Sequence, residues 1–347
     1  IKGEQGIEVN VEDSIAAIEN YISSEWDGGN AEIELVAEVV EPRGSEEDLE
    51  QITDLMGSYT TNYKDSGQNR CDNISNATSK INGTLLYPGE EFSVYEAIGP
   101  LDAANGYELA GAYENGQTVE SYGGGVCQVS TTLYNAAILA ELEITQRSNH
   151  SMIVSYVKPS MDAAIAGDYK DLRFVNNQDI PIYIEGYTEG KNVTFKIYGH
   201  DTRPSNRVVT YESEVVSEQD PGTQYVATGD PAGYMKTAQG KHIGYVARLW
   251  KVVTVDGVEE SREIFNKSTY KASPKIVNVG TASADPNVSA VIGAALATGD
   301  EATINAAVAP YAASAAAILN PAPVEQPSQE EQAITGTVDE SQITGGE

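Results

Sequence analysis

The spacing of apolar positions divides the chain into regions of different character. In residues 11–22 apolar side chains recur at helical spacing, and in residues 31–40 they alternate as in a strand with one buried face. A capping-box pattern at residues 45–48 predicts a second helix that runs to Met56. Residues 1–57 are therefore expected to form a small α+β piece.

The second region, residues 58–205, has the pattern of a mixed sheet with helices packed on it. Helical periodicity predicts two helices, at about 69–81 and 128–142. Short runs of β-branched and aromatic residues, bounded by turn residues, predict strands at 83–87, 152–157, 172–176, 181–187 and 192–198. This region is expected to be a mixed α/β domain and to hold the principal core.

The third region, residues 206–281, reads as an all-β module. Long strand-like runs cover 207–216, 241–255 and 259–270, and turn signals separate them. The pair Asp256-Gly257 between alternating strands is a strong hairpin signal. With the preceding regions, this module makes the expected fold class α+β.

The last region, residues 282–347, is expected to be an acidic, low-complexity and largely disordered tail. It contains no Lys or Arg and is rich in Ala, Gly, Pro, Glu and Gln. Such a composition favours disorder, above all in residues 321–347. Residues 290–319 could form a weak helix, although they carry little to bury.

The charge of the chain excludes one class of partner. A formal net charge of -31, from 21 basic and 52 acidic residues, argues against nucleic acid, because phosphate binding needs a basic surface.

No run of eighteen apolar residues exists, so no membrane span is expected. The chain does not begin with Met, and we expect a fragment whose missing N-terminal segment carried an export signal or anchor.

The run from Gly123 to Thr132 carries the clearest chemical signal. It places Cys127 directly after a glycine triplet and before an apolar, helix-like segment. A thiol at a helix start meets unpaired backbone N–H groups and the positive end of the helix dipole, which favour the nucleophilic thiolate. The same N–H groups could hold an oxyanion. The alternative is a small buried residue in a tight turn.

A cysteine nucleophile needs a base, and His150 is the expected one. A cysteine and a histidine well separated in sequence form the usual nucleophile pair. His200 is expected in a linker and His242 on the surface of the β module, whereas the alternative for His150 is simple packing.

A bridge between Cys71 and Cys127 would disable the nucleophile, and we expect free thiols. No HExxH, CxxC or phosphate-binding loop occurs, so neither metal nor cofactor is expected.

Residues 58–200 resemble a VanW domain. The motifs that carry the resemblance follow one another in the expected order: Asn69-Arg70, Asn73-Ile74, Pro88 to Ser93, Gly123 to Ala136, Arg147 with His150-Ser151, Asp162-Ala163, and Asp171 to Phe174 with Asn176. The resemblance implies a protein of the Gram-positive cell envelope. Some members with this cysteine are associated with L,D-transpeptidase activity, which forms peptidoglycan cross-links.

The resemblance also suggests which residues assist the thiol. Asp162 is the first candidate for orienting the imidazole and Asp171 the second, although either could cap a turn. The family's Gly-Arg before this aspartate is replaced here by Ser160-Met161. The residues expected to bind substrate are Arg147 and Arg70, through stem carboxylates, and Gly124, Gly125, Gln128 and Ser130, along the site. Either arginine could instead be a structural ion-pair partner in the core.

The flanking regions resemble envelope modules as well. Residues 1–57 resemble part of a module found before VanW domains and associated with peptidoglycan binding. Residues 206–281 resemble the five-glycine (G5) β module associated with wall or amino-sugar binding. Each could instead be a spacer.

Three functions remain open at this point. The first is an extracellular L,D-transpeptidase that joins stem peptides through a Cys127 thioester, with stem peptides and wall glycans as partners. The second is a cysteine carboxypeptidase or endopeptidase in which water replaces the acceptor amine. The third is a non-catalytic wall-binding or glycopeptide-resistance accessory protein.

Overall fold

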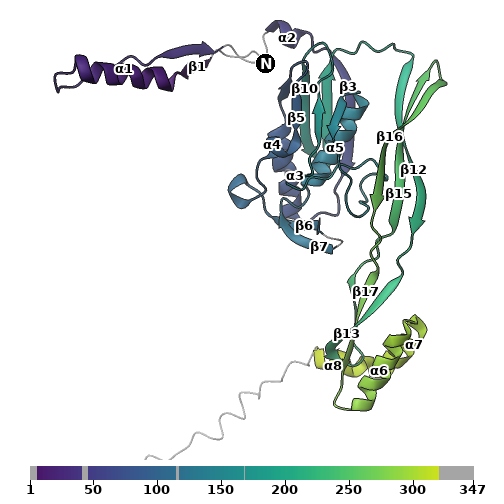
Figure 1. Cartoon of the computed structure of the whole chain (residues 1–347). Helices are drawn as coiled ribbons and strands as arrows, with labels where there is room; N and C mark the ends of the chain where they lie inside the picture. Colours follow the sequence, from purple (N-terminus) through teal and green to yellow (C-terminus); the bar gives the residue numbers. More distant parts are fainter. Residues whose placement is uncertain (1–5, 41–45, 115–116, 168, 320–347) are drawn as a thin grey trace, which may run out of the picture. The chain divides into compact units, whose positions relative to one another are not determined.

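A computed structural model describes residues 6–40, 46–114, 117–167 and 169–319 (Figure 1). Contacts divide the chain into two compact units. The first comprises residues 1–221 and 242–273, and the second comprises residues 222–241 and 274–347. Each unit is therefore built from segments that are distant in sequence.

The first unit begins with a small α+β piece. Strand β1 (Gly6–Val9) pairs antiparallel with β2 (Ala37–Val40), and α1 (Val11–Ser24) lies between them in sequence. The predicted helix is confirmed, whereas only the end of the predicted strand pairs. Helix α2 (Glu46–Glu50) is shorter than expected, because the chain becomes strand β3 at Asp54. The expected helix to Met56 was wrong.

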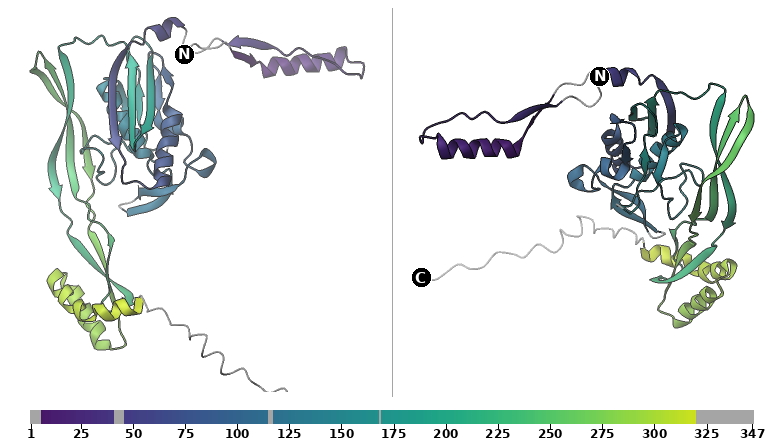
Figure 2. Two further views of the ribbon diagram at one scale, coloured as in Figure 1. Left: turned by 180° about the vertical axis from the view of Figure 1, so that it is seen from behind. Right: turned by 45° about the horizontal axis from the view of Figure 1, so that its top comes forward.

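A four-stranded antiparallel sheet carries the main core of the first unit. Its order is β3 (Asp54–Asn62), β11 (Asn192–Gly199), β10 (Ile182–Glu189) and β4 (Thr84–Leu86). Helices α3 (Gln68–Ile81) and α5 (Val126–Leu139) pack on it and on each other (Figures 1 and 2). Both helices and three of the predicted strands are confirmed here.

One glycine of β3 allows close approach of α5 to the sheet. A Cβ at Gly57 would lie 2.3 Å from the carbonyl oxygen of Ala136, so no larger residue fits there. Helix α5 is buried along almost its whole length. The helix that begins beside Cys127 is thus fixed to the sheet.

Shorter elements surround this core. They are β5 (Glu91–Ser93), β9 (Arg173–Val175) and β8 (Glu143–Gln146) in one sheet, the hairpin β6 (Leu109–Glu114) and β7 (Gln117–Tyr122), α4 (Val94–Ile98) and the 3-10 turn η1 (Ala103–Asn105). The predicted strand 152–157 is instead an irregular loop. Met152 and Val154 are buried there without strand pairing, which explains their apolar alternation.

Three long strands complete the first unit. They are β12 (Arg207–Gln219), β15 (Gly244–Val255) and β16 (Val258–Tyr270), all antiparallel. The predicted hairpin is confirmed: Asp256 and Gly257 have φ values of 51° and 78°, which such a tight turn requires. Leu249 is fully buried in the same core as α5. The long strands and the mixed domain therefore share one core.

The second unit combines a small sheet with helices. Its strands are β13 (Thr223–Pro231), β17 (Lys275–Ala282) and β14 (Met235–Gln239), followed by α6 (Pro286–Thr298), α7 (Glu301–Val308), η2 (Ala309–Tyr311) and α8 (Ala312–Leu319). Val279, Ile292 and Ile304 are fully buried together. The expectation of a largely disordered tail was wrong for residues 286–319, because these apolar positions find a core. Residues 321–347 lie outside the described residues.

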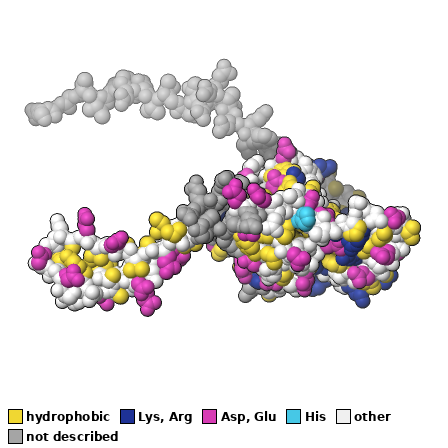
Figure 3. All heavy atoms as spheres, turned by 90° about the horizontal axis from the view of Figure 1, so that it is seen from above, with side chains coloured by type: hydrophobic (Ala, Val, Ile, Leu, Met, Phe, Trp, Pro, Cys, Tyr) yellow, Lys and Arg dark blue, Asp and Glu magenta, His cyan; other side chains and the backbone are white. Residues whose placement is uncertain are grey.

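The stretch Glu301–Leu319 is also long and apolar enough, by length and composition, to cross a membrane. Polar residues such as Thr303, Asn305 and Ser314 interrupt this stretch, so it contains no continuous apolar run. In the structure, Ile304 and Val308 of this stretch are buried in the core of the second unit. Acidic side chains are scattered across the face shown in Figure 3.

Candidate functional site

A glycine turn sets the start of helix α5. Gly123 and Gly125 have φ values of 75° and 115°, which side-chain-bearing residues rarely adopt. A Cβ at Gly124 would lie 2.6 Å from the carbonyl oxygen of Ala110. All three glycines are therefore required by the backbone path, and the turn delivers Cys127 to the second position of the helix.

The thiol of Cys127 lies against the backbone of Ile165. Its sulfur is 3.4 Å from both the carbonyl oxygen and the backbone nitrogen of Ile165. The Ile165 N–H can donate to a thiolate, and the carbonyl can accept from a thiol. The backbone N–H of Cys127 finds no acceptor among the described residues, as expected in a first helical turn. Both cysteines are free, so the two thiols form no bridge.

His150 is held by Asp162. The imidazole Nδ1 lies 2.7 Å from Asp162 Oδ2, and the backbone N–H of His150 donates to the same oxygen at 2.7 Å. The His150 side chain is 7% exposed and Asp162 is fully buried. With Nδ1 bound to a carboxylate, Nε2 is the ring nitrogen left for other partners, and the Tyr156 hydroxyl oxygen lies 3.5 Å from it.

Electrostatics couple the thiol and the imidazole. Burial raises the pKa of Cys127, but the hydrogen bond and charge of His150 outweigh it, and the pKa lies below its ordinary value. Burial lowers the pKa of His150, but Asp162 and Cys127 outweigh it and raise the pKa to about 9. Burial likewise opposes ionisation of Asp162, yet His150 and Arg147 keep its pKa low. The arrangement favours a thiolate–imidazolium pair beside a carboxylate.

Arg147 supports Asp162. Its Nη2 donates to Asp162 Oδ1 at 3.0 Å, and its Nε donates to the Asp162 carbonyl at 2.7 Å. The Arg147 side chain is 8% exposed. The sequence left two roles open for this arginine, a contact with a substrate carboxylate and a structural ion pair, and its guanidinium forms the ion pair with a carboxylate of the protein.

Asp171 lies in another part of the fold. It accepts hydrogen bonds from the Ser93 hydroxyl at 2.6 Å and from the backbone N–H of Tyr95 at 2.9 Å, at the start of α4. Arg173 Nε is 3.1 Å away. Of the two aspartates expected to orient the imidazole, the structure brings only Asp162 to His150, and Asp171 caps a helix.

Gln128 and Arg70 form a wall next to the thiol. Arg70 Nη2 donates to Gln128 Oε1 at 2.9 Å, and Gln128 Nε2 donates to the Thr61 hydroxyl at 3.0 Å. Arg70 Nη1 donates to the Ser66 hydroxyl at 2.7 Å. Ser130, another expected binding residue, is fully buried one turn further along α5.

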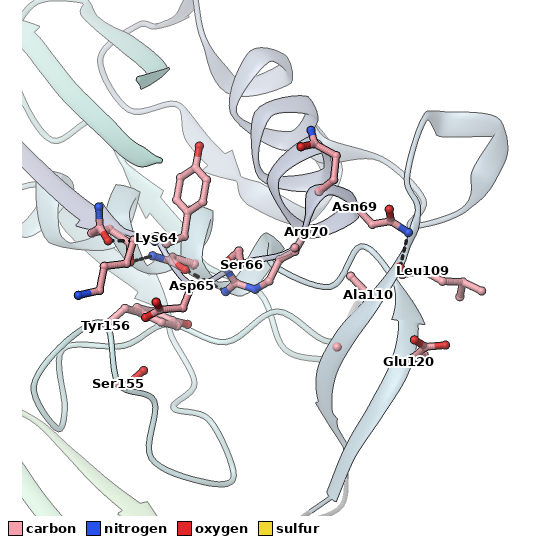
Figure 4. Close-up of a pocket in the computed structure, with 16 residues that line it drawn as sticks. Lys64, Asp65, Ser66, Asn69, Arg70, Leu109, Ala110, Glu120, Ser155 and Tyr156 are labelled. Atoms are coloured by element: carbon pink, nitrogen blue, oxygen red, sulfur yellow. Dashed lines mark hydrogen bonds between the residues drawn. The ribbon is translucent and has the colours of Figure 1, made fainter. Parts of the chain in front are cut away.

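A pocket of about 910 Å³ opens on this wall (Figure 4). Its lining comes from residues 62–70, from the β6–β7 hairpin, and from Gln128, Ser155 and Tyr156. Neither Cys127 nor His150 lines the pocket, but Gln128 follows Cys127 in sequence and the Tyr156 hydroxyl lies 3.5 Å from His150 Nε2. The lining carries both charges: Lys64 and Arg70 are cationic, and Asp65 and Glu120 are anionic.

Sequence reasoning missed several residues of this site. Tyr156, Ile165 and the loop before Arg70 carry no motif that marks them, and Tyr270, which also contacts Asp162, lies in the third region of the chain. The backbone contact of Ile165 has no side-chain signal at all. Among the described residues, no group of three or more His, Cys, Asp or Glu side chains is arranged as a metal site.

Two family models match the chain. Residues 69–198 match the model described as VanW like protein, and residues 210–282 match the G5 domain. The chain thus contains a VanW-like domain followed by a G5 domain, as the sequence analysis expected. Both domains are typical of cell-wall-associated extracellular proteins.

Two curated proteins are similar to this chain. The uncharacterized protein YoaR of Bacillus subtilis (strain 168) is 33% identical over 187 residues, which cover 54% of this chain and 62% of that protein. The vancomycin B-type resistance protein VanW of Enterococcus faecalis (strain ATCC 700802 / V583) is 30% identical over 118 residues, 32% of this chain and 42% of that protein. The similarity spans less than two thirds of either relative.

Two solved structures resemble the G5 region. The IgA1 protease G5 domain is 26% identical, with coverage of 22% of this chain and 94% of that domain and a TM-score of 0.17. The HP0197-G5 structure is 14% identical, with coverage of 22% and 100% and a TM-score of 0.15. At these TM-scores the likeness carries no argument about the fold.

Proposed function

Since the chain contains a VanW-like domain followed by a G5 domain, we propose that it acts in the cell envelope as a cysteine L,D-transpeptidase that cross-links peptidoglycan stem peptides. The observation that carries this proposal is the pairing of His150 Nδ1 with Asp162 Oδ2 at 2.7 Å, together with the electrostatic coupling of that imidazole to Cys127 at the start of a helix. A thiol, a base and an orienting carboxylate in series are the parts of an acyl-transfer site.

Acylation uses the thiolate–imidazolium pair. The Cys127 thiolate attacks the carbonyl carbon after the third stem residue, and the C–N bond to the terminal D-residue breaks. The His150 imidazolium gives its proton to the departing amine, and a thioester remains on Cys127. The backbone N–H of Cys127 is placed to hold the oxyanion, because it lies in the first turn of α5 without an acceptor of its own.

Transfer reverses the roles. Neutral His150 removes a proton from the acceptor amine of a second stem, the amine attacks the thioester carbonyl, and the new amide forms as the thiolate leaves. Asp162 holds Nδ1 throughout, so that Nε2 keeps facing the reacting atoms. The pair returns to its starting state after each cycle.

The pocket is the proposed binding site for stem peptides. Stem peptides carry free carboxylates and free amines, and the lining offers cations and anions for both. Arg70 is fixed by Ser66 and Gln128, so its charge is held in one place.

Arg70→Gln is expected to raise KM more than it lowers kcat, because it removes a contact outside the reacting centre.

Purified muropeptides test the proposal directly. Wild-type protein is expected to produce cross-linked dimers by mass spectrometry, and Cys127→Ala is expected to produce none. Cys71→Ser serves as the matched control, because this second thiol lies on α3 and should be dispensable. Dimers from Cys127→Ala would overturn the proposal. Trimmed monomers in place of dimers would show that water is the acceptor and that the protein is a carboxypeptidase or endopeptidase.

A non-catalytic wall-binding role is the second candidate, and the G5 domain is the observation that favours it. In this role, the Cys127→Ser variant would bind isolated sacculi as well as the wild-type protein does. Neither protein would alter muropeptides. Loss of sacculus binding on this substitution would count against the accessory role, since the thiol would then take part in binding.

A further inference from the structure

Strand β16 of the G5 domain reaches the buried carboxylate beside His150. The Tyr270 hydroxyl donates to Asp162 Oδ1, the oxygen that Arg147 also holds. Two residues earlier, the Ser268 hydroxyl accepts from Arg147 Nη1 at 2.9 Å. Tyr270 is 2% exposed and Ser268 is 3% exposed, so both hydroxyls are shielded from solvent and form hydrogen bonds within this network. All four residues belong to the first compact unit.

Tyr270 also holds the loop that leads to Asp162. Its hydroxyl accepts from the backbone N–H of Ser160 at 2.7 Å. Ser160 is fully buried and has a φ of 66°, a conformation that costs energy for a residue with a side chain. The strand thus fixes both the carboxylate and the strained backbone two residues before it.

We infer that strand β16 of the G5 domain is a structural part of the catalytic site, in which Tyr270 and Ser268 are positioning residues that hold Asp162 and Arg147 behind His150. This inference rests on the proposed function. The G5 domain matches a family model of its own, separate from that of the VanW-like domain. Here its strand supplies polar contacts that the VanW-like domain does not supply itself.

The two carboxylate oxygens of Asp162 have different partners. Oδ1 is bound by Tyr270 and Arg147, which leaves Oδ2 directed at His150. Burial and the neighbouring Asp162 raise the pKa of Tyr270, so its hydroxyl keeps its proton and remains a donor at any working pH. Without this donor, the carboxylate keeps Arg147 and His150 but loses one of the two partners of Oδ1, so it is held less firmly and is less stable as an anion, and His150 loses part of its support.

Other ionisable groups also face this network. They are Cys127 and Tyr134 on α5, Arg147 and His150 after β8, and Tyr156 on the following loop, with Arg70 of α3 acting on Tyr156. None of them changes when Tyr270 becomes phenylalanine. A shift in the titration of Cys127 on that substitution would therefore report the loss of the Tyr270 hydroxyl.

The test compares Tyr270→Phe with Tyr211→Phe. Tyr211 is a matched control, because its hydroxyl also joins the G5 domain to the core, through the Ile138 carbonyl at 2.9 Å, but does not touch Asp162. The pH dependence of Cys127 alkylation is measured in a Cys71→Ser background, together with the melting temperature. Both variants are expected to lose similar thermal stability. Only Tyr270→Phe is expected to move the thiol titration upward, with alkylation about three- to tenfold slower on its acid side.

The outcomes separate the inference from the proposed function. An unchanged titration in Tyr270→Phe overturns the inference and leaves the proposed function standing. An ordinary thiol titration in the wild-type protein overturns the proposed function and the inference together. If Tyr270→Phe fails to fold, Ser268→Ala removes the bond to Arg147 without touching Ser160. A smaller upward shift in that variant supports the inference, and no shift overturns it.

Discussion

The side chains of Cys127, His150, Asp162 and Arg147 illustrate how buried charges are tolerated at the scale of single residues. Burial opposes the ionised form of the thiol, the imidazole and the carboxylate alike. In their charged forms the four groups carry two negative and two positive charges, so the cluster is neutral as a whole. The attraction between opposite charges in contact outweighs the free-energy cost of desolvation. A single unpaired charge buried at this place would instead be lost through a change in protonation.

The first prediction concerns the dependence of the thiol on its base. Without His150, burial and the charge of Asp162 raise the pKa of Cys127 and the Ile165 N–H alone lowers it, so His150→Ala is expected to raise the thiol pKa above the ordinary value of about 8.5. The rate of alkylation against pH, in the Cys71→Ser background, measures this shift. A profile that does not move on substitution of His150 would show that the two side chains are not coupled.

The second prediction separates the two aspartates. Asp162→Asn removes the charge that supports the imidazolium, and the pKa of His150 is expected to fall toward its ordinary value, with turnover reduced at least about tenfold. Asp171→Asn is expected to leave both unchanged and to cost about 1–3 kcal/mol of stability, because it disturbs a buried helix cap. NMR titration of His150 and thermal unfolding distinguish the two variants. Equal effects on His150 would contradict the assignment.

The third prediction concerns pH. The pKa of His150 is raised from 6.5 to about 9, so the stability contributed by its protonation is complete below pH 6.5 and is lost as the pH rises through about 9. The same proton serves the leaving amine, and turnover is expected to decline on the alkaline side near pH 9. Stopped assays across pH 6–10 measure this limb. In His150→Ala both the alkaline limb and the stability change should disappear.

At the scale of elements, the turn before α5 explains why the thiol sits where it does. The glycines cannot be exchanged for alanine without strain or a clash, and the buried α5 leaves no freedom to relax. The same rigidity keeps the Cys127 N–H and the Cys127 sulfur in a fixed relation. A loop without these restraints would hold the thiol less well.

The fourth prediction tests this turn. Gly124→Ala would push a Cβ to within 2.6 Å of the Ala110 carbonyl oxygen, and is expected to destabilise the protein by about 2 kcal/mol or more. Gly67→Ala is the control, because nothing lies within 4 Å of its added Cβ, and as a change at the N-cap of α3 it should cost about 1 kcal/mol or less. Denaturant unfolding measures both. Equal stability of the two variants would contradict the packing argument.

At the scale of the whole molecule, a second charged cluster joins the VanW-like and G5 domains within the first unit. Glu141, at the end of α5, accepts from Arg207 of β12 at 2.5 and 3.0 Å and lies 2.8 Å from Lys251 of β15. Arg203, between the two domains in sequence, is 3.5 Å away. With the Tyr270 contact, this cluster makes strands β12, β15 and β16 an integral part of the first unit, whereas β13, β14 and β17 belong to the second unit.

The fifth prediction follows from the charge of Glu141. Burial raises its pKa, but Arg207 and Lys251 outweigh burial and lower the pKa from 4.5 to about 2. The stability contributed by Glu141 is therefore present above pH 4.5 and is lost as the pH falls through about 2. Glu141→Gln is expected to cost about 2–3 kcal/mol at pH 7 and little at pH 2. Unfolding curves at both values check this, and an equal loss at both would contradict it.

The sequence by itself determined the features that depend on near neighbours in the chain. Apolar periodicity was enough for helices 69–81 and 128–142, and the residue pair Asp256-Gly257 was enough for the hairpin, because each signal acts within a few residues. The glycine–cysteine run and the family motifs likewise marked Cys127, His150 and Asp162 as candidates. Where apolar alternation was read as a strand at 152–157, burial in a loop produced the same pattern.

Only the tertiary structure decided which candidates meet. Asp162 and Asp171 look equivalent in sequence, yet one binds His150 and the other caps α4, because the path of the chain between them decides which carboxylate reaches the imidazole. Arg147 could have faced substrate, and its burial against Asp162 is a result of packing. Tyr270 stands 108 residues beyond Asp162, and no local pattern encodes a contact made by the folding of a separate domain onto the core.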